Sequence, residues 1–133
     1  MAKKKYNRTA GTKRLDKLIK DIIRIRDEHI CQWCGEHCEG KDAHTSHVVP
    51  KHNGASWRRF DLLNVKLLCS HCHLYMWHKS PTEAGRWFAE RFPHRDKYLE
   101  KYRYGKTAKI SSAEMENLEA EYKEKFKELS NGS

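Results

Sequence analysis

Two Cys-x-x-Cys pairs are the residues of this chain best suited to chemistry. Cys31 and Cys34 form the first pair, and Cys69 and Cys72 form the second. A tight turn that carries two thiolates supplies half of a tetrahedral zinc site. Two such turns therefore indicate one structural Zn²⁺ bound by four cysteines.

A fifth cysteine and two histidines leave alternatives open at this site. Cys38 lies in the polar loop after the first pair and is interpreted as a bystander thiol, with ligand exchange with Cys34 as the alternative. His71 or His73 replacing one cysteine would give a site of three cysteines and one histidine. Four cysteines at matching spacing favour the all-cysteine set.

Closing the two pairs on one ion also brings other polar side chains together. The stretch between the pairs holds His47 and Asn64, and His73 directly follows the last cysteine. A histidine has an ordinary pKa near 6.5, so it can accept a proton or bind a metal ion at neutral pH. Phosphodiester hydrolysis needs such a base to activate water, and a cation to neutralise charge on the phosphate.

The order of these residues resembles the HNH endonucleases of the ββα-metal fold. The resemblance rests on the segment His-Thr-Ser-His-Val-Val-Pro at 44–50, on Asn64, and on Cys-Ser-His-Cys-His at 69–73. Within that family it looks most like the zinc-ribbon branch, which includes small phage recombination nucleases of the NinG kind. It covers about residues 28–80, over a third of the chain.

The resemblance implies a role for each polar residue. His47 would be the general base, and His73 would bind a catalytic Mg²⁺ or Mn²⁺ that is distinct from the zinc. Asn64 would hold the loop that carries the base. The alternatives are a histidine packed on a short strand for His47 and an ordinary turn residue for Asn64.

One position departs from the family pattern. Most relatives carry Asp or His immediately before the base as another metal ligand, whereas this chain has Ser46, whose hydroxyl is a poor ligand for a hard cation. Relatives of the NinG kind have a metal-competent residue three positions before the base, which here is His44. Strand alternation puts His44 on the face of Ser46, so His44 is expected to be the second cation ligand. His78 is within reach of the cation from the next turn, but is expected to be a surface histidine.

The charge balance favours a polyanionic partner. The chain has 27 Lys and Arg against 18 Asp and Glu, a net charge of +9 and a pI near 9.4. Phosphate contacts of basic side chains give affinity for DNA without reading its sequence, although each such residue alone is more often a solvated surface charge. The residues predicted to contact DNA are Lys51, Arg58, Arg59 and Lys66.

Composition also bounds the compartment and the core. No apolar run reaches the roughly 18–20 residues of a membrane span, and the lysine-rich N-terminus lacks an apolar signal core. Metal-binding cysteines indicate a reducing compartment, expected to be the cytoplasm of a bacterium or of a phage-infected cell. With 38% hydrophobic and 34% charged residues, the core must be small, so zinc binding is expected to contribute to folding.

Helices and two short strands must position these side chains. Thr12 is a plausible N-cap for the first helix, and Pro93 is expected to stop the helix before it. Apolar periodicity and turn residues predict helices at 12–29, 71–79, 81–91 and 96–104, a final helix capped by Ser111 or Ser112, and strands at 44–50 and 64–68.

The predicted fold is α+β and mostly helical. Its centre is a ββα-metal motif, an antiparallel hairpin plus a helix, stapled by the four-cysteine zinc site and flanked by N- and C-terminal helices. Residues 1–11 are predicted to be a flexible basic arm and residues 12–109 a nuclease domain with its core at 28–80. Residues 110–133 are predicted to be an amphipathic helix that docks on the domain or on a second copy in a homodimer.

These features together predict a metal-dependent DNA endonuclease of the HNH type. The alternative is a non-catalytic zinc-ribbon module that binds nucleic acid. That alternative explains the charge and the cysteines equally well, and Ser46 is its main support.

Overall fold

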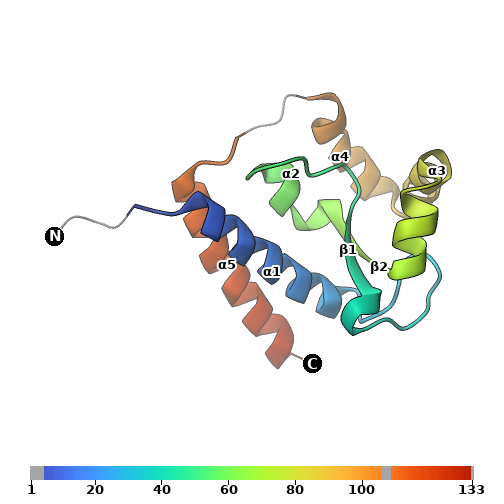
Figure 1. The fold of residues 1–133 in the computed structure, drawn as a ribbon, viewed down its shortest axis with the longest axis horizontal. Helices are drawn as coiled ribbons and strands as arrows, with labels where there is room; N and C mark the ends of the chain where they lie inside the picture. The colour runs from blue at the N-terminus through green and yellow to red at the C-terminus, as the bar shows by residue number, and fades with distance from the viewer. Residues whose placement is uncertain (1–4, 106–108, 133) are drawn as a thin grey trace.

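Two long helices lie side by side along one edge of the molecule: α1, Arg8–Arg26, and α5, Ser112–Asn131 (Figure 1). The computed structural model describes residues 5–105 and 109–132, so the first four residues of the predicted basic arm lie outside it. The two helices run in the same direction. Arg8, at the start of α1, donates hydrogen bonds to the Ile110 carbonyl at 2.7 Å and to the Ser112 hydroxyl at 3.2 Å.

Helix α1 begins earlier than its sequence pattern predicts. Asn7 is the N-cap, and its side-chain oxygen accepts a hydrogen bond from the Ala10 N–H at 3.0 Å. Thr12 lies inside the helix and donates its hydroxyl proton to the Arg8 carbonyl, so the prediction that Thr12 caps the helix is wrong. Residues 8–11 are therefore helical rather than part of an arm. The buried apolar face of α1 consists of Leu15, Ile19, Ile22 and Ile23.

Gly11 has a packing reason for its place inside α1. Tyr6 precedes the N-cap, and its ring lies where a Cβ at residue 11 would stand. The Tyr6 hydroxyl donates to Glu119 on α5 at 3.0 Å, and Arg14 donates to the same carboxylate oxygen at 2.9 Å. The missing side chain of Gly11 thus lets Tyr6 join α1 to α5.

The hairpin at the centre of the molecule pairs β1, Ala43–His47, with β2, Val65–Cys69, in antiparallel register. Ala43 lies opposite Cys69, and His47 lies opposite Val65. All five residues of β2 are buried, because α1 and the helix that follows β2 both pack on it. The loop between the strands contains a short helix, α2, Trp57–Phe60, and a 3₁₀ turn, Leu62–Asn64.

A π-helix, Cys72–Trp77, follows β2 directly and is succeeded by α3, Pro81–Arg91, and α4, Pro93–Tyr104. Pro93 does not only end α3, as predicted, but occupies the first turn of α4. A proline is tolerated there because its missing N–H would have no partner inside the helix. The predicted cap of the final helix is confirmed: Ser111 and Glu114 form a reciprocal capping box.

Two apolar clusters hold these elements together. The larger one joins α1, β2 and α5, and the smaller one joins Val49 to Phe88 of α3 and Leu99 of α4. Burying a Leu or Phe side chain contributes about 1.5–3 kcal/mol. Of the two predicted docking partners for the final helix, the structure shows the domain: the apolar face of α5, with Met115, Leu118 and Tyr122, packs on α1 of the same chain.

The predicted fold class is confirmed. The described residues are mostly helical and contain one antiparallel hairpin followed by a helix, with four cysteines gathered beside it. Among the described helices, none is both long and apolar enough to cross a bilayer.

We predict that the effect of Gly11→Ala on stability depends on Tyr6. In the wild-type background the new methyl group displaces the Tyr6 ring, and a hydrogen bond to a carboxylate contributes about 1.5–3 kcal/mol, so the variant should be less stable. In a Tyr6→Ala background the clash is absent, and alanine should stabilise the helix by about 1 kcal/mol relative to glycine. Urea unfolding of the four proteins measures both effects, and the same sign in both backgrounds would contradict this packing role.

Candidate functional site

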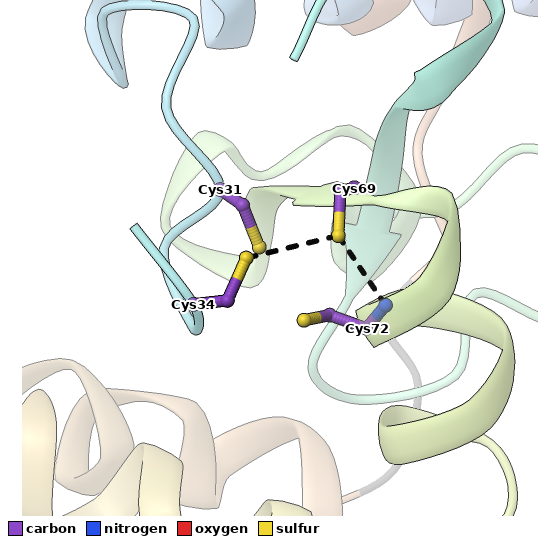
Figure 2. Close-up of side chains that lie close together, drawn as sticks. All are labelled: Cys31, Cys34, Cys69 and Cys72. Atoms are coloured by element: carbon purple, nitrogen blue, oxygen red, sulfur yellow. Dashed lines mark hydrogen bonds between the residues drawn. The ribbon is translucent and has the colours of Figure 1, made fainter. Parts of the chain in front are cut away.

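Four cysteine sulfurs converge beside the hairpin. The Sγ atoms of Cys31, Cys34, Cys69 and Cys72 all lie within 4.8 Å of one another, and Figure 2 shows all four side chains pointing into one space. The Cys34 and Cys69 sulfurs are 3.9 Å apart. In a tetrahedral zinc site with Zn–S bonds of about 2.3 Å, neighbouring sulfurs are about 3.8 Å apart. The four thiols therefore fit one zinc ion.

Local backbone geometry forms each half of this cluster. In the first half, the Cys31 N–H donates to the Glu36 carbonyl, and the Gly35 N–H returns to the Cys31 carbonyl, each at 2.9 Å. Gly35 has a φ of 79°, a value that glycine adopts without steric cost. In the second half, Cys69 ends β2 and Cys72 begins the π-helix, and the Cys72 N–H points at the Cys69 sulfur at 3.4 Å.

Cys38 is buried but does not belong to the four-sulfur group. Burial raises the pKa of its thiol to about 11, so it remains protonated and apolar at neutral pH. This agrees with the interpretation of Cys38 as a bystander.

An aromatic stack joins the first cysteine pair to α3. The Trp33 ring lies parallel to the Trp87 ring, with centroids 4.6 Å apart and planes 11° apart. Trp33 stands between Cys31 and Cys34, and Trp87 lies on α3. The position of α3 is thus coupled to the conformation of the cysteine turn.

His47 stands at the end of β1 with one ring nitrogen already engaged. Its Nε2 lies 2.9 Å from the Arg59 carbonyl oxygen. A carbonyl only accepts, so Nε2 carries the proton and Nδ1 retains a free lone pair. Burial lowers the pKa of His47; the carbonyl hydrogen bond opposes this effect, and the charge of Lys51 adds to it. The ring is therefore neutral at physiological pH and able to accept a proton.

Asn64 fixes the loop that leaves His47. Its side chain is completely buried and exchanges hydrogen bonds with both the N–H and the carbonyl of Val49, at 2.8 and 2.9 Å. The same amide nitrogen donates to the Arg58 carbonyl at 2.8 Å, and the Asn64 backbone carbonyl accepts from Val48. One residue thus joins both ends of the loop between the strands, in agreement with the loop-holding role that the sequence suggested.

His47 and His73 line the same cavity, which has a volume of about 730 Å³. His78 also lines it, although its sequence position predicts only a surface histidine. Lys51, His52 and Arg103 add further basic side chains to the cavity wall. Among the described residues that line this cavity, none is Asp or Glu.

His73 lies between two other imidazoles. Its Nδ1 is 3.0 Å from Nδ1 of His44, and its Nε2 is 3.0 Å from Nε2 of His78. Burial, and after it the neighbouring imidazoles of His78 and His44, together lower the pKa of His73 to about 4, so its ring is neutral. His44 thus lies beside His73, as a shared cation would require. However, His44 does not line the cavity.

The three imidazoles form a row rather than a shell around one point. Within residues 5–105 and 109–132, the cysteine cluster alone brings three or more possible metal-binding side chains to within bonding range of a single ion. A second cation would consequently be held by two imidazoles at most, with the remaining ligands supplied by water or phosphate.

Lys66, which the sequence predicts to contact DNA, is not exposed to solvent. Its side chain is completely buried, and its ammonium group donates to the Ser46 hydroxyl at 3.0 Å and lies 3.3 Å from the centroid of the Trp77 ring. Burial lowers the pKa of Lys66 well below its ordinary value, and Arg95 adds to the effect. Ser46 is likewise fully buried, so its hydroxyl is committed to the interior.

The two loop arginines are structural in this conformation. Arg58 is buried and donates to the Tyr102 carbonyl at 2.9 Å, so it lacks the exposure that the predicted DNA contact requires. Arg59 pairs with both carboxylate oxygens of Asp16, at 3.0 and 2.6 Å, and is largely covered. Lys51 is exposed and lines the cavity, as a phosphate contact requires.

Sequence reasoning missed Arg103 as a cavity residue. Arg103 comes from α4, and nothing in its local pattern indicates that α4 would reach the cavity. For His78 the sequence left an approach to the cation open but favoured a surface position, whereas the structure places His78 in the cavity wall. The π-helix that changes its spacing from His73 has no distinct signature in the residues themselves.

Residues 31–75 match a family model described as HNH endonuclease. The matched segment spans both cysteine pairs, His44, His47, Asn64 and His73, and it covers about a third of the chain. No curated protein and no solved structure matches the chain. Within residues 31–75, the chain thus combines similarity to the HNH endonuclease model with four cysteines whose spacing fits one metal ion.

Proposed function

We propose that this protein is a metal-dependent endonuclease that hydrolyses phosphodiester bonds in DNA. The observation that carries the proposal is the shared cavity of His47 and His73, in which His47 is held through Nε2 and keeps Nδ1 free. The family match over residues 31–75 supports the same conclusion.

His47 is the proposed general base. Its free Nδ1 takes a proton from a water molecule, whose oxygen then forms a bond to the scissile phosphorus as the bond to the leaving sugar oxygen breaks. The Arg59 carbonyl fixes the tautomer that this step needs and stabilises the imidazolium that results. Asn64 acts as a positioning residue, because it anchors the loop immediately after the base.

His73 is the proposed ligand of a catalytic Mg²⁺ or Mn²⁺, with His44 proposed from the sequence as the second. Two imidazole nitrogens 3.0 Å apart fit one ion, since metal–nitrogen bonds of about 2.1 Å at right angles separate them by about 3 Å. Such an ion supplies neutralisation of the charge that develops on the phosphate and on the leaving oxygen.

Basic residues at the cavity are the proposed DNA contacts. Lys51 is exposed beside His47, and Arg103 lines the cavity from α4, where it forms an ion pair with Asp96 at 2.7 Å that a phosphate would have to replace. Arg59 can take part only by exchanging its ion pair with Asp16 for a phosphate. These contacts position the backbone and carry no base information, so little sequence specificity is expected.

Zinc is the proposed structural ion of the four cysteines. It would join the end of β2 and the start of the π-helix to the turn after α1, and so keep His73 beside the hairpin. The resemblance to NinG-like nucleases of the zinc-ribbon branch, including the spacing of His44 from His47, favours a recombination role on branched DNA in a bacterial or phage-infected cytoplasm.

One observation favours a second function, a non-catalytic zinc module that binds nucleic acid. The position before the base, usually a metal ligand in the family, is Ser46, and its hydroxyl is occupied by the buried ammonium of Lys66. A cation here would therefore lack that ligand. Cleavage that depends on His47 distinguishes the two functions.

We predict that His47→Ala slows nicking of supercoiled plasmid in Mn²⁺ by about 10²- to 10⁴-fold, because the general base is removed. Zinc content, measured by atomic emission, should not change. His71→Ala is the matched control, since His71 lies between Cys69 and Cys72 in the sequence, is exposed and does not line the cavity. Equal nicking by wild type and His47→Ala would favour the binding module.

We predict an acid limb in the pH profile of kcat/KM, which reports the DNA-free protein, with its midpoint below 6.5. Burial lowers the pKa of His47, and a base works only when neutral, so kcat/KM should rise with pH through this lowered pKa and then level off. Lys51→Gln removes a charge that lowers the pKa, and should move the limb to higher pH. A limb centred above 6.5 in the wild type would contradict the assignment of His47.

We predict one tightly bound zinc per chain, lost in Cys72→Ser and retained in Cys38→Ser, because only the former removes a member of the four-sulfur group. Structural zinc contributes roughly 10–16 kcal/mol of apparent binding energy, so Cys72→Ser should be partly unfolded. Loss of the Trp33–Trp87 stack should change the tryptophan fluorescence. Zinc loss in Cys38→Ser as well would show that the fifth cysteine takes part.

A further inference from the structure

His78 faces His73 because the helix between them is widened. On an α-helix, residues five apart point about 140° away from each other. Here the segment Cys72–Trp77 is a π-helix, and the His78 N–H donates to the carbonyl five residues earlier, that of His73, at 3.2 Å. The two rings consequently meet, with centroids 4.6 Å apart and Nε2 atoms 3.0 Å apart. Single π turns are rare and often occur at functional sites.

A backbone carbonyl sets the tautomers along the row of imidazoles. His44 Nε2 lies 3.0 Å from the Lys41 carbonyl, which only accepts, so His44 carries its proton on Nε2 and has a lone pair on Nδ1. His73 must then donate from Nδ1 to that lone pair across 3.0 Å. This leaves the free lone pair of His73 on Nε2, the nitrogen that faces His78.

Of the two imidazole pairs, His44 with His73 and His73 with His78, only the second lines the cavity with both of its rings. His73 and His78 line the cavity together with His47, whereas His44 does not. An ion that neutralises a phosphate attacked by water at His47 must be reached from this cavity. The Nε2 atoms of His73 and His78 are spaced to share such an ion once His78 adopts the tautomer with its proton on Nδ1.

We propose that His73 and His78 are the two protein ligands of the catalytic cation, and that His44 is a positioning residue that holds His73 in the tautomer required for binding. This inference rests on the proposed nuclease function and revises the ligand role that the sequence suggested for His44. Outer-shell partners of this kind orient metal-binding histidines in many proteins.

The ligand chemistry also selects the ion. Two imidazoles with no carboxylate among the described cavity residues suit a transition metal better than Mg²⁺, which prefers oxygen ligands. Mn²⁺ should therefore bind more tightly than Mg²⁺ in the absence of DNA.

Calorimetric titration of the zinc-loaded full chain with Mn²⁺, without DNA, tests the proposal. His78→Ala should weaken Mn²⁺ binding by more than about 100-fold, and His44→Ala by about 10- to 100-fold, the range for loss of an outer-shell partner. His71→Ala, an exposed histidine outside the cavity, should bind Mn²⁺ as the wild type does. Unchanged zinc content would show that each variant is folded.

The tautomer of the His73 imidazole gives a second readout, which would not change if His44 had only a packing role. Long-range ¹H–¹⁵N spectra of the Mn²⁺-free protein should show the His73 proton on Nδ1. His44→Ala should lose this preference, and His44→Asn should restore it, because the asparagine oxygen can accept the same hydrogen bond.

The outcomes separate this inference from the proposed function. If His78→Ala binds Mn²⁺ as tightly as the wild type does, His78 is not a ligand. If DNA nicking nevertheless depends on His47, the proposed nuclease function stands. Mn²⁺ binding that depends on His78, in a protein that nicks no DNA, would support the metal site and refute the nuclease.

Discussion

The gathering of four sulfurs within 4.8 Å is the constraint on which the cavity side of the molecule depends. Three of the four cysteines stand at junctions: Cys31 follows the turn after α1, Cys69 ends β2, and Cys72 begins the π-helix. Because His73 is the next residue, its place is set by the metal site rather than by packing of its own. The antiparallel register then brings β1, with His47 at its end, back across the same strand. Two imidazoles from distant parts of the chain thereby reach one cavity.

Buried polar contacts refine this arrangement where the apolar core is thin. Asn64 makes all its side-chain hydrogen bonds to backbone groups of the loop, so the loop can be irregular and still hold one conformation. Lys66 has no carboxylate within ion-pair distance among the described residues, and its ammonium rests on Ser46 and the Trp77 ring instead. A cation–π contact of a desolvated ammonium contributes about 2 kcal/mol, which offsets part of the cost of burying the charge. Ser46 thus has a structural role that explains why a metal-binding residue is missing there.

The sequence was sufficient wherever spacing and residue type carried the information. The cysteine pairs predicted the metal cluster, apolar periodicity predicted the helices, and Ser111 with Glu114 marked the cap of α5. It was insufficient where tertiary contacts decide. Lys66 has the sequence position of an exposed strand lysine, but all residues of β2 are buried. Arg58 is buried and donates to a backbone carbonyl of α4. His78 reaches His73 only because one helical turn widens, and no residue type announces that change.

The pairing of α1 with α5 has a consequence for how the protein is made. Part of the apolar face of α1 is covered by a helix that begins at Ser112, so a ribosome that has synthesised only the first hundred residues has produced an α1 that can pack only on the hairpin and α2. The cysteine turns and both cavity histidines have been translated by then. Completion of the core must wait for α5 to leave the exit tunnel, so the surroundings of the cavity reach their final stability only at the end of synthesis.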